Sequence, residues 1–388
     1  MKKIKFILMF LLLIILGSLF LPQTSYAKEI TSSKDLLAKQ AFSAVIADAY
    51  SGQIIHQKNS LEKKPIASMT KIMTLLVLYD NLSNGKINYE DNVVVSKNAA
   101  NMGGSQAFLD AGSVHKVTDL IKTIIVASAN DSCVALAEHL FGSTEKFVEQ
   151  MNVKAKEINL DATNFVNCTG LPALNQYSCA GDCVKMFIEL IKQENNYFDY
   201  SKIWIDDYQH PSGRITSLTN TNKLIRLYDG CDGGKTGYTN EAQHCLCATA
   251  SRGDTRLIAC VLGEPDSKTR FAEVSEMFNY GFANYENKVY LNKNDIIESN
   301  VKNGKINTIK VKAETNLTSF CKKGTDNNEI STITQFDKIV APVKIGEKVG
   351  KAYLIKNNEV IAETNLISTM NIERKTYFDE IIDIIKNW

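Results

Sequence analysis

The chain has 388 residues, of which 44% are hydrophobic, and its 44 basic and 43 acidic residues leave a formal net charge of +1. This length and composition favour two or three domains with a substantial core. Because the charge is close to zero, the sequence offers no broad electrostatic attraction for nucleic acid, and no nucleic-acid partner is expected.

Residues 1–27 have the layout of a secretory signal peptide. Three lysines precede an apolar run over residues 6–21, and the small-residue pattern Ser25-Tyr26-Ala27 follows it. We expect cleavage after Ala27. The alternative is an uncleaved membrane anchor, but the apolar run is shorter than the roughly 18 residues that a spanning helix needs. The sequence therefore predicts export to the outer face of the cytoplasmic membrane or the cell-wall space.

Residues 28–287 are predicted to form an α/β sandwich, with strands at both ends and helices between them. The strands are indicated by alternating apolar residues around turns at Ser51-Gly52 and Arg252-Gly253-Asp254. The helices are indicated by apolar residues at helical spacing, and Gly142 closes one of them. The expected elements are a hairpin over 41–55, helices over 65–80, 117–141 (one or two helices) and 182–192, strands over 245–250 and 256–262, and a helix over 271–285.

Residues 288–370 have a different character and are predicted to form a small all-β domain. Short β-like segments at 306–311, 338–343 and 351–355 are separated by turn signals such as Asn303-Gly304 and Gly346. The chain contains no internal repeat of solenoid period.

Residues 371–388 are predicted to form an amphipathic helix, in which Tyr377, Ile381 and Trp388 recur at helical spacing. A terminal Trp is typical of a membrane interface. We expect this helix to act as a peripheral anchor on the membrane surface. The alternative is a terminal helix that packs on its own protein.

Nine cysteines are present, an odd number, so at least one has no intramolecular disulfide partner. Cys179 and Cys183 could share a helix face, and Cys245-Leu246-Cys247 is an isolated CxC, but neither has a matching second pair. We therefore expect buried free thiols, no metal site and no cofactor.

Three short motifs occur in a fixed order: Ser68-Met69-Thr70-Lys71, Ser128-Ala129-Asn130 and Lys235-Thr236-Gly237. This order is typical of serine enzymes that recognise penicillin. A single S-x-x-K has little value, because the same pattern begins at Ser25, Ser60, Ser83, Ser113, Ser143, Ser299 and Ser319. Ser68 differs from these because it lies near the start of a strongly apolar helix, where Ser and Lys three residues apart share one face.

The chemistry requires these residue types. A serine hydroxyl is a weak nucleophile until a base takes its proton, and Lys71 can act as that base only when it is neutral. Burial and the second cation Lys235 would both disfavour its charge. Ser128 would then pass a proton toward the leaving group, and Asn130 would hold the substrate amide and Lys71.

Substrate binding is expected at the third motif. Lys235 would attract the terminal carboxylate of the substrate, Thr236 would add a hydroxyl contact, and Gly237 would let the backbone come close. The backbone N–H groups of Ser68 and Tyr238 would bind the oxyanion, each donor contributing about 3 kcal/mol.

Each motif also has a purely structural interpretation. Ser68 could be a helix N-cap, Ser128 and Asn130 could be polar residues of a helix connection, and Lys235-Thr236-Gly237 could be a turn at a strand edge. Another S-x-N occurs at Ser96-Lys97-Asn98. The order of the three motifs, each in its expected element, favours the enzyme.

With these motifs in place, the chain resembles the low-molecular-weight penicillin-binding proteins, the D-alanyl-D-alanine carboxypeptidases among the serine peptidases. The similarity covers most of residues 34–283 and a later segment. It is carried by Met102-Gly103-Gly104-Ser105-Gln106, Ser128–Ser132, Gly170-Leu171-Pro172, Asp232–Thr239 and Ala341–Gly346. One departure is Gln243-His244-Cys245, where relatives usually carry Gly before the aromatic residue.

The resemblance implies a fold like that of the penicillin-binding proteins and β-lactamases, followed by a β-domain and a C-terminal helix that contacts the membrane. It also implies the reaction: Ser68 attacks the penultimate D-alanine of a peptidoglycan pentapeptide ending in D-Ala-D-Ala, the terminal D-alanine leaves, and water hydrolyses the acyl-enzyme. β-Lactams would acylate Ser68 stably.

Two rival functions remain. A class A β-lactamase shares the three motifs but has a Glu that activates the deacylating water, and the corresponding residues 164–178 contain no Glu. A scaffold protein on an inactive fold would be expected to have an altered motif, and every motif position is intact. The motifs alone do not distinguish carboxypeptidase from endopeptidase or transpeptidase action.

Overall fold

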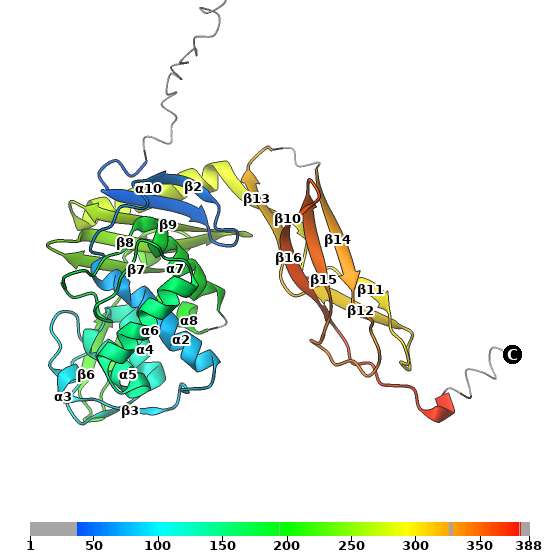
Figure 1. The fold of residues 1–388 in the computed structure, drawn as a ribbon, viewed down its shortest axis with the longest axis horizontal. Coiled ribbons are helices and arrows are strands. Elements are labelled where there is room, and N and C mark those ends of the chain that lie inside the picture. Colours follow the sequence, from blue (N-terminus) through cyan, green and yellow to red (C-terminus); the bar gives the residue numbers. More distant parts are fainter. Residues whose placement is uncertain (1–36, 194, 326–328, 380, 382–388) are drawn as a thin grey trace, which may run out of the picture. The chain divides into compact units, whose positions relative to one another are not determined.

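The computed structural model describes residues 37–193, 195–325, 329–379 and 381, so the predicted signal peptide lies outside the described residues. The described chain begins with an α/β region (Figure 1). Its elements are β1 Ser43–Asp48, β2 Ile54–Lys58, η2 Ala67–Thr70, α2 Lys71–Ser83, β3 Asn92–Val94, α3 Lys97–Ala100, β4 Val114–Lys116, α4 Val117–Ala127, α5 Asn130–Phe141, α6 Thr144–Glu157, α7 Ala180–Lys192, α8 Tyr197–Ser201, β5 Ile205–Gln209, β6 Ile215–Thr219, α9 Leu224–Leu227, β7 Cys231–Thr239, β8 Gln243–Arg252, β9 Thr255–Glu264 and α10 Ser267–Asn284.

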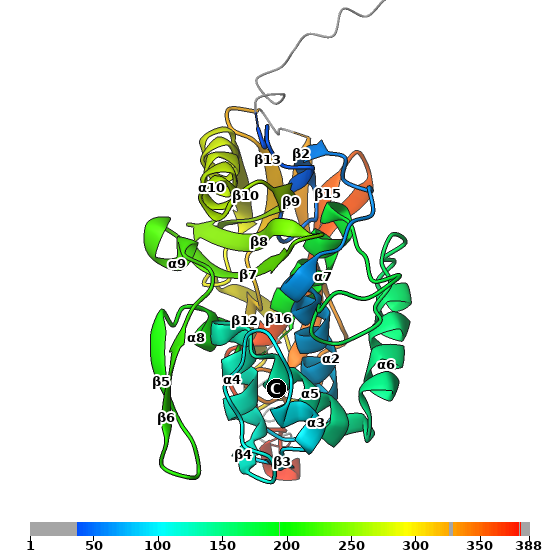
Figure 2. The same cartoon turned by 90° about the vertical axis from the view of Figure 1, so that its left-hand side faces the viewer.

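A five-stranded antiparallel sheet of order β2-β1-β9-β8-β7 forms the centre of this region. Helix α10 covers one face, with Leu224 of the short helix α9 in the same core, and helices α2, α4, α5, α6 and α7 gather on the opposite side (Figure 2). Successive side chains of a strand point to opposite faces, so Val45 and Ala47 of β1 join the larger core while Ala44 and Ile46 join the core under α10. The predicted α/β sandwich is confirmed, and β7 lies at the edge of its sheet.

The helices differ from their predicted ranges in ways that shape the site. The helix expected over 65–80 begins as a 3₁₀ turn, Ala67–Thr70, and continues as α2 to Ser83. The stretch 117–141 forms two helices because Ser128 adopts a left-handed conformation, with φ 62°, between them. Gly142 closes the second helix as predicted, with φ 79°.

An all-β region follows, as predicted. It contains a five-stranded sheet of order β11-β12-β16-β15-β14 and the pair β10-β13. The prediction of a strand over 338–343 is wrong: Val340 and Val343 make only isolated bridges. Pro342 has no N–H to donate to a ladder, which explains the interruption. The strands are β10 Tyr285–Leu291, β11 Ile297–Asn300, β12 Thr308–Ala313, β13 Leu317–Lys322, β14 Ile330–Phe336, β15 Lys348–Lys356 and β16 Glu359–Ser368.

At the C-terminus, residues 377–379 are helical, and residues 380 and 382–388 lie outside the described part. The amphipathic helix over 371–388 therefore stays a prediction. Within the described ranges, every helix is too short or too polar to cross a membrane.

The nine cysteines are free thiols, and eight of them are buried. In the part of the chain that the structure describes, no three His, Cys, Asp or Glu side chains converge as a set of metal ligands.

Candidate active site

Ser68 lies in the 3₁₀ turn that leads into α2. The cap residues of the turn and of the helix are Ile66 and Thr70, and neither position has a side-chain cap bond. Ser68 is therefore not an N-cap, contrary to its structural interpretation. The preceding residue, Ala67, has φ 49°, an uncommon left-handed conformation for a residue with a Cβ. Such strain is often found at functional sites.

Lys71 follows one helical turn later and has no solvent exposure. Its Nζ lies 3.1 Å from Ser68 Oγ, 2.6 Å from Asn130 Oδ1 and 2.6 Å from the carbonyl oxygen of Thr169. The amide and carbonyl oxygens can only accept hydrogen bonds. A neutral amine has two hydrogens for these two acceptors and one lone pair, which is left for the hydroxyl of Ser68.

The second motif occupies the junction of α4 and α5. The left-handed Ser128 is buried, and its Oγ meets no hydrogen-bond partner among the described residues. Asn130, at the start of α5, holds the facing loop: its backbone N–H donates to Ser105 O and its Nδ2 to Gly103 O. Asn130 thus connects Lys71 to the wall formed by this loop.

The third motif lies on β7. Gly237 passes so close to the turn before Ser68 that an added Cβ would be 2.4 Å from Ile66 O. Lys235 is buried and donates to Thr236 O at 3.1 Å, and Thr236 Oγ1 donates to Thr221 Oγ1 at 2.8 Å. The close approach at Gly237 brings the third motif alongside the first.

The two buried lysines influence each other's charge. Burial lowers the pKa of Lys71, although nearby acidic groups partly oppose this effect. Burial also lowers the pKa of Lys235 well below its ordinary value, and the positive charge of Lys71 lowers it further. The site therefore disfavours the state in which both amines are protonated, and this is the condition for an uncharged base.

Comparison with known families supplies the decisive observation. Residues 28–266, more than half of the chain, match the family described as D-alanyl-D-alanine carboxypeptidase. The chain belongs to this family of serine peptidases. Residues 285–374 match the C-terminal domain of penicillin-binding protein 5.

Individual relatives agree with this membership. The carboxypeptidase chain is 38% identical to D-alanyl-D-alanine carboxypeptidase DacF of Bacillus subtilis, with 94% of each chain covered. The crystal structure of penicillin binding protein 5 from Haemophilus influenzae is similar, with 31% identity, a TM-score of 0.65, and 86% of this chain and 98% of that chain covered. Penicillin binding protein 3 of Streptococcus pneumoniae, at 23% identity and a TM-score of 0.68, shares the fold over 86% of this chain and 99% of that one.

The structure adds site groups of the carboxypeptidase that the motifs did not predict. The carbonyl of Thr169 contacts Lys71, and Asn167 Oδ1 holds this loop by accepting from the backbone N–H groups of Thr169 and Gly170. Gly170 is essential to the approach, because its added Cβ would be 2.0 Å from Ala67 O. The family-like segment Gly170-Leu171-Pro172 was the available signal for this loop.

Arg270 of α10 is a second unpredicted group. It is buried and donates from Nη1 to the carbonyl oxygens of Gly237 and Cys245. Burial lowers its pKa to about 10. Its guanidinium therefore places a positive charge beside β7, the strand that carries the third motif.

The departure at residues 243–245 has a local consequence. Gln243 adopts φ 58°, a conformation that favours Gly, and the ring of His244 stacks on Tyr238 with centroids 4.4 Å apart. This agrees with the prediction that His244 packs rather than acts as a base.

Two motif-like sequences of the carboxypeptidase outside the site, the S-x-N at Ser96 and the S-x-x-K at Ser143, are helix caps. Ser96 accepts from the N–H of Ala99 at the start of α3, and Ser143 accepts from the N–H of Lys146 at the start of α6. Both serines satisfy free N–H groups of a helix, which accounts for these patterns without any catalytic role.

Proposed function

We propose that this chain removes the terminal D-alanine from peptidoglycan stem pentapeptides through an acyl-enzyme on Ser68. One observation carries the proposal: Lys71 Nζ, buried and with a lowered pKa, lies between Ser68 Oγ, Asn130 Oδ1 and Thr169 O. Two acceptors use the hydrogens of a neutral amine, and its lone pair is left to take the proton of Ser68.

Acylation follows from this arrangement. Ser68 Oγ attacks the carbonyl of the penultimate D-alanine while its proton moves to Lys71. The N–H groups of Ser68 and Tyr238 bind the oxyanion, and Ser128 carries a proton to the departing amine. The hydroxyl of Ser128 has no hydrogen-bond partner in the part of the chain that the structure describes, which supports this role because it can bond a substrate nitrogen.

The substrate is held by the third motif. Lys235, protonated when an anion binds, attracts the terminal carboxylate, and Thr236 adds a hydroxyl contact. A carboxylate beside Lys235 favours protonation of that amine. The positive charge of Lys235 then favours the neutral form of Lys71 by charge repulsion. Asn130 holds the peptide amide. β-Lactams enter the same site and acylate Ser68.

The surroundings of the enzyme are part of the proposal. We infer export, with a signal peptide over 1–27, a catalytic domain over 28–287, a β-domain over 288–370 and a membrane-binding helix over 371–388. The family matches at 28–266 and 285–374 support the division. Tyr377 and Phe378 expose 74% and 75% of their surface, which supports binding to a membrane surface. Sedimentation with lipid vesicles, with and without residues 371–388, tests the helix.

Labelling with fluorescent penicillin and D-alanine release from a pentapeptide test the enzyme. The wild-type chain is expected to be labelled and to release D-alanine, and Ser68→Ala is expected to do neither. Ser60→Ala, which alters another S-x-x-K serine, is the matched control and should behave as wild type. A labelled Ser68→Ala variant would contradict the proposal, and rapid loss of the label with no D-alanine release would favour a β-lactamase.

A further inference from the structure

Strand β7, which carries the third motif, lies at the edge of the central sheet, because within the described ranges it pairs with β8 alone. Backbone N–H and C=O groups on the outer side of an edge strand have no strand to pair with. Side chains from another element satisfy them along the first part of β7. These contacts lie directly before Lys235.

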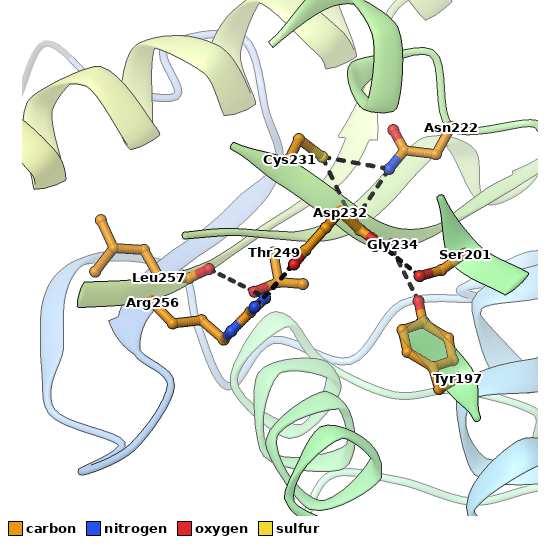
Figure 3. Close-up of polar contacts among 10 residues, drawn as sticks. Tyr197, Ser201, Asn222, Cys231, Asp232, Gly234, Thr249, Arg256 and Leu257 are labelled. Atoms are coloured by element: carbon orange, nitrogen blue, oxygen red, sulfur yellow. Dashed lines mark hydrogen bonds and ion pairs between the residues drawn. The ribbon is translucent and has the colours of Figure 1, made fainter. Parts of the chain in front are cut away.

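Helix α8 provides two of the contacts (Figure 3). Tyr197 Oη accepts from the N–H of Gly234 at 2.9 Å, and Ser201 Oγ donates to the carbonyl of Asp232 at 2.5 Å. Both α8 residues are 2% exposed. A helix therefore takes the place that a sixth strand would occupy over residues 232–234.

The same segment of β7 is irregular and held from its other side. The register with β8 shifts between Cys231 and Gly233, so Asp232 is an inserted residue. Its carboxylate receives two bonds from Arg256 of β9, at 2.7 and 2.8 Å (Figure 3). A Gly-rich strand such as β7 specifies its register only weakly, and these bonds oppose a shift along β8.

Among the described residues, the side-chain hydrogen bonds from α8 to β7 end at Gly234. Alternate residues of a strand direct their N–H groups to the same edge. The N–H of Tyr238, four residues after Gly234, therefore points to the same outer edge, toward which the scissile carbonyl would bind. The position of Gly234 fixes the register of both Lys235 and Tyr238.

We propose that Tyr197 and Ser201 are positioning residues that set the register of β7 and thereby place the amine of Lys235 for the substrate carboxylate. They act through the backbone of residues 232–234 and do not touch the substrate. This inference rests on the proposed function, since it needs Lys235 to bind a carboxylate.

The test compares acylation by benzylpenicillin with acylation by its methyl ester, which lacks the carboxylate. Tyr197→Phe keeps the ring and removes only the oxygen that accepts from Gly234. Leaving this N–H unpaired is expected to reduce the acid-to-ester ratio of acylation rates by about 5- to 10-fold. Ser201→Ala, a second variant that removes the bond to Asp232, is expected to reduce it in the same direction.

Tyr228→Phe is the matched control, because the hydroxyl of Tyr228 also makes one bond near β7, but to Asn279 of α10 at 2.9 Å. It should leave the ratio unchanged, and thermal unfolding of all three variants monitors the fold. An unchanged ratio in Tyr197→Phe and Ser201→Ala, or an equal loss in Tyr228→Phe, overturns this inference alone. Failure of penicillin to label the wild-type chain overturns the proposed function, and this inference with it.

Discussion

Glu264 and Glu273 form a buried acid pair whose protonation affects stability. Glu264, at the end of β9, is 0% exposed, and neither of its oxygens meets a donor among the described residues. Glu273 of α10 instead accepts from the backbone N–H groups of Gln40 and Ala41. Burial and the neighbouring Glu273 raise the pKa of Glu264 to about 9. At neutral pH Glu264 is therefore a protonated acid beside Glu273.

The raised pKa of Glu264 makes folding stability fall as pH rises. The folded protein keeps a proton that the unfolded chain, with a Glu pKa of about 4.3, has already released. Its contribution is therefore fully present below about pH 4.3 and decreases until about pH 9. The slope in this window is at most about 1.4 kcal/mol per pH unit, so the limit between about pH 5 and pH 7.5 is about 3.5 kcal/mol.

Glu264→Gln isolates this effect, because the amide can still donate to Glu273 but does not titrate. Urea unfolding is measured between about pH 5 and pH 8. We expect the wild-type free energy of unfolding to fall by about 1–3 kcal/mol more than that of the variant. The variant should therefore be the more stable of the two at the upper end of the range. Glu62→Gln, at an exposed position, should follow the wild type. Parallel pH dependence in wild type and Glu264→Gln would refute the protonated pair.

Three further predictions concern the site. Lys71→Arg places a permanent cation at the base position, and penicillin labelling should slow by about 10²- to 10⁴-fold. Gly237→Ala puts a Cβ 2.4 Å from Ile66 O, so both labelling and the midpoint of thermal unfolding should fall; normal labelling would show that the close approach is unnecessary. Ser96→Ala removes the cap bond to Ala99, so stability should fall by about 1 kcal/mol in urea unfolding while labelling stays normal.

Much of the fold was predictable from local patterns. Alternating apolar residues with Ser51-Gly52 predicted the hairpin of β1 and β2, and Gly142 marked the end of α5. Helix α6 was missed, although Ser143 is a capping residue, because its apolar residues Phe147 and Met151 are few and its surface is charged. The hairpin of β5 and β6 was missed as well, since its paired strands expose Ile205 and Ile215 and lack the expected alternation.

For the candidate site, predictability depended on whether the chemistry lies in a side chain or in the backbone. Ser68 and Lys71 are three residues apart, so their contact can be inferred from helical geometry alone. Asn130 and Thr169 reach the same amine from 59 and 98 residues away. The amide of Asn130 belongs to a recognisable motif, but Thr169 contributes its carbonyl, a group that every residue has. No residue type marks such a group, and only the folded loop reveals it.

The sequence predicted that the pKa of Lys71 is lowered, but it did not predict all of the groups that surround its amine. Burial of the amine was expected from an apolar helix, and burial lowers its pKa. An amine with a charge would need three acceptors, and Ser68 Oγ could serve as the third. These three oxygens fit the amine in either form, so it is burial that favours the neutral one by lowering the pKa of Lys71. When the amine is neutral, Asn130 Oδ1 and the Thr169 carbonyl accept its two hydrogens and leave its lone pair for the hydroxyl of Ser68, so the base depends on the Thr169 carbonyl as much as on the motif residues.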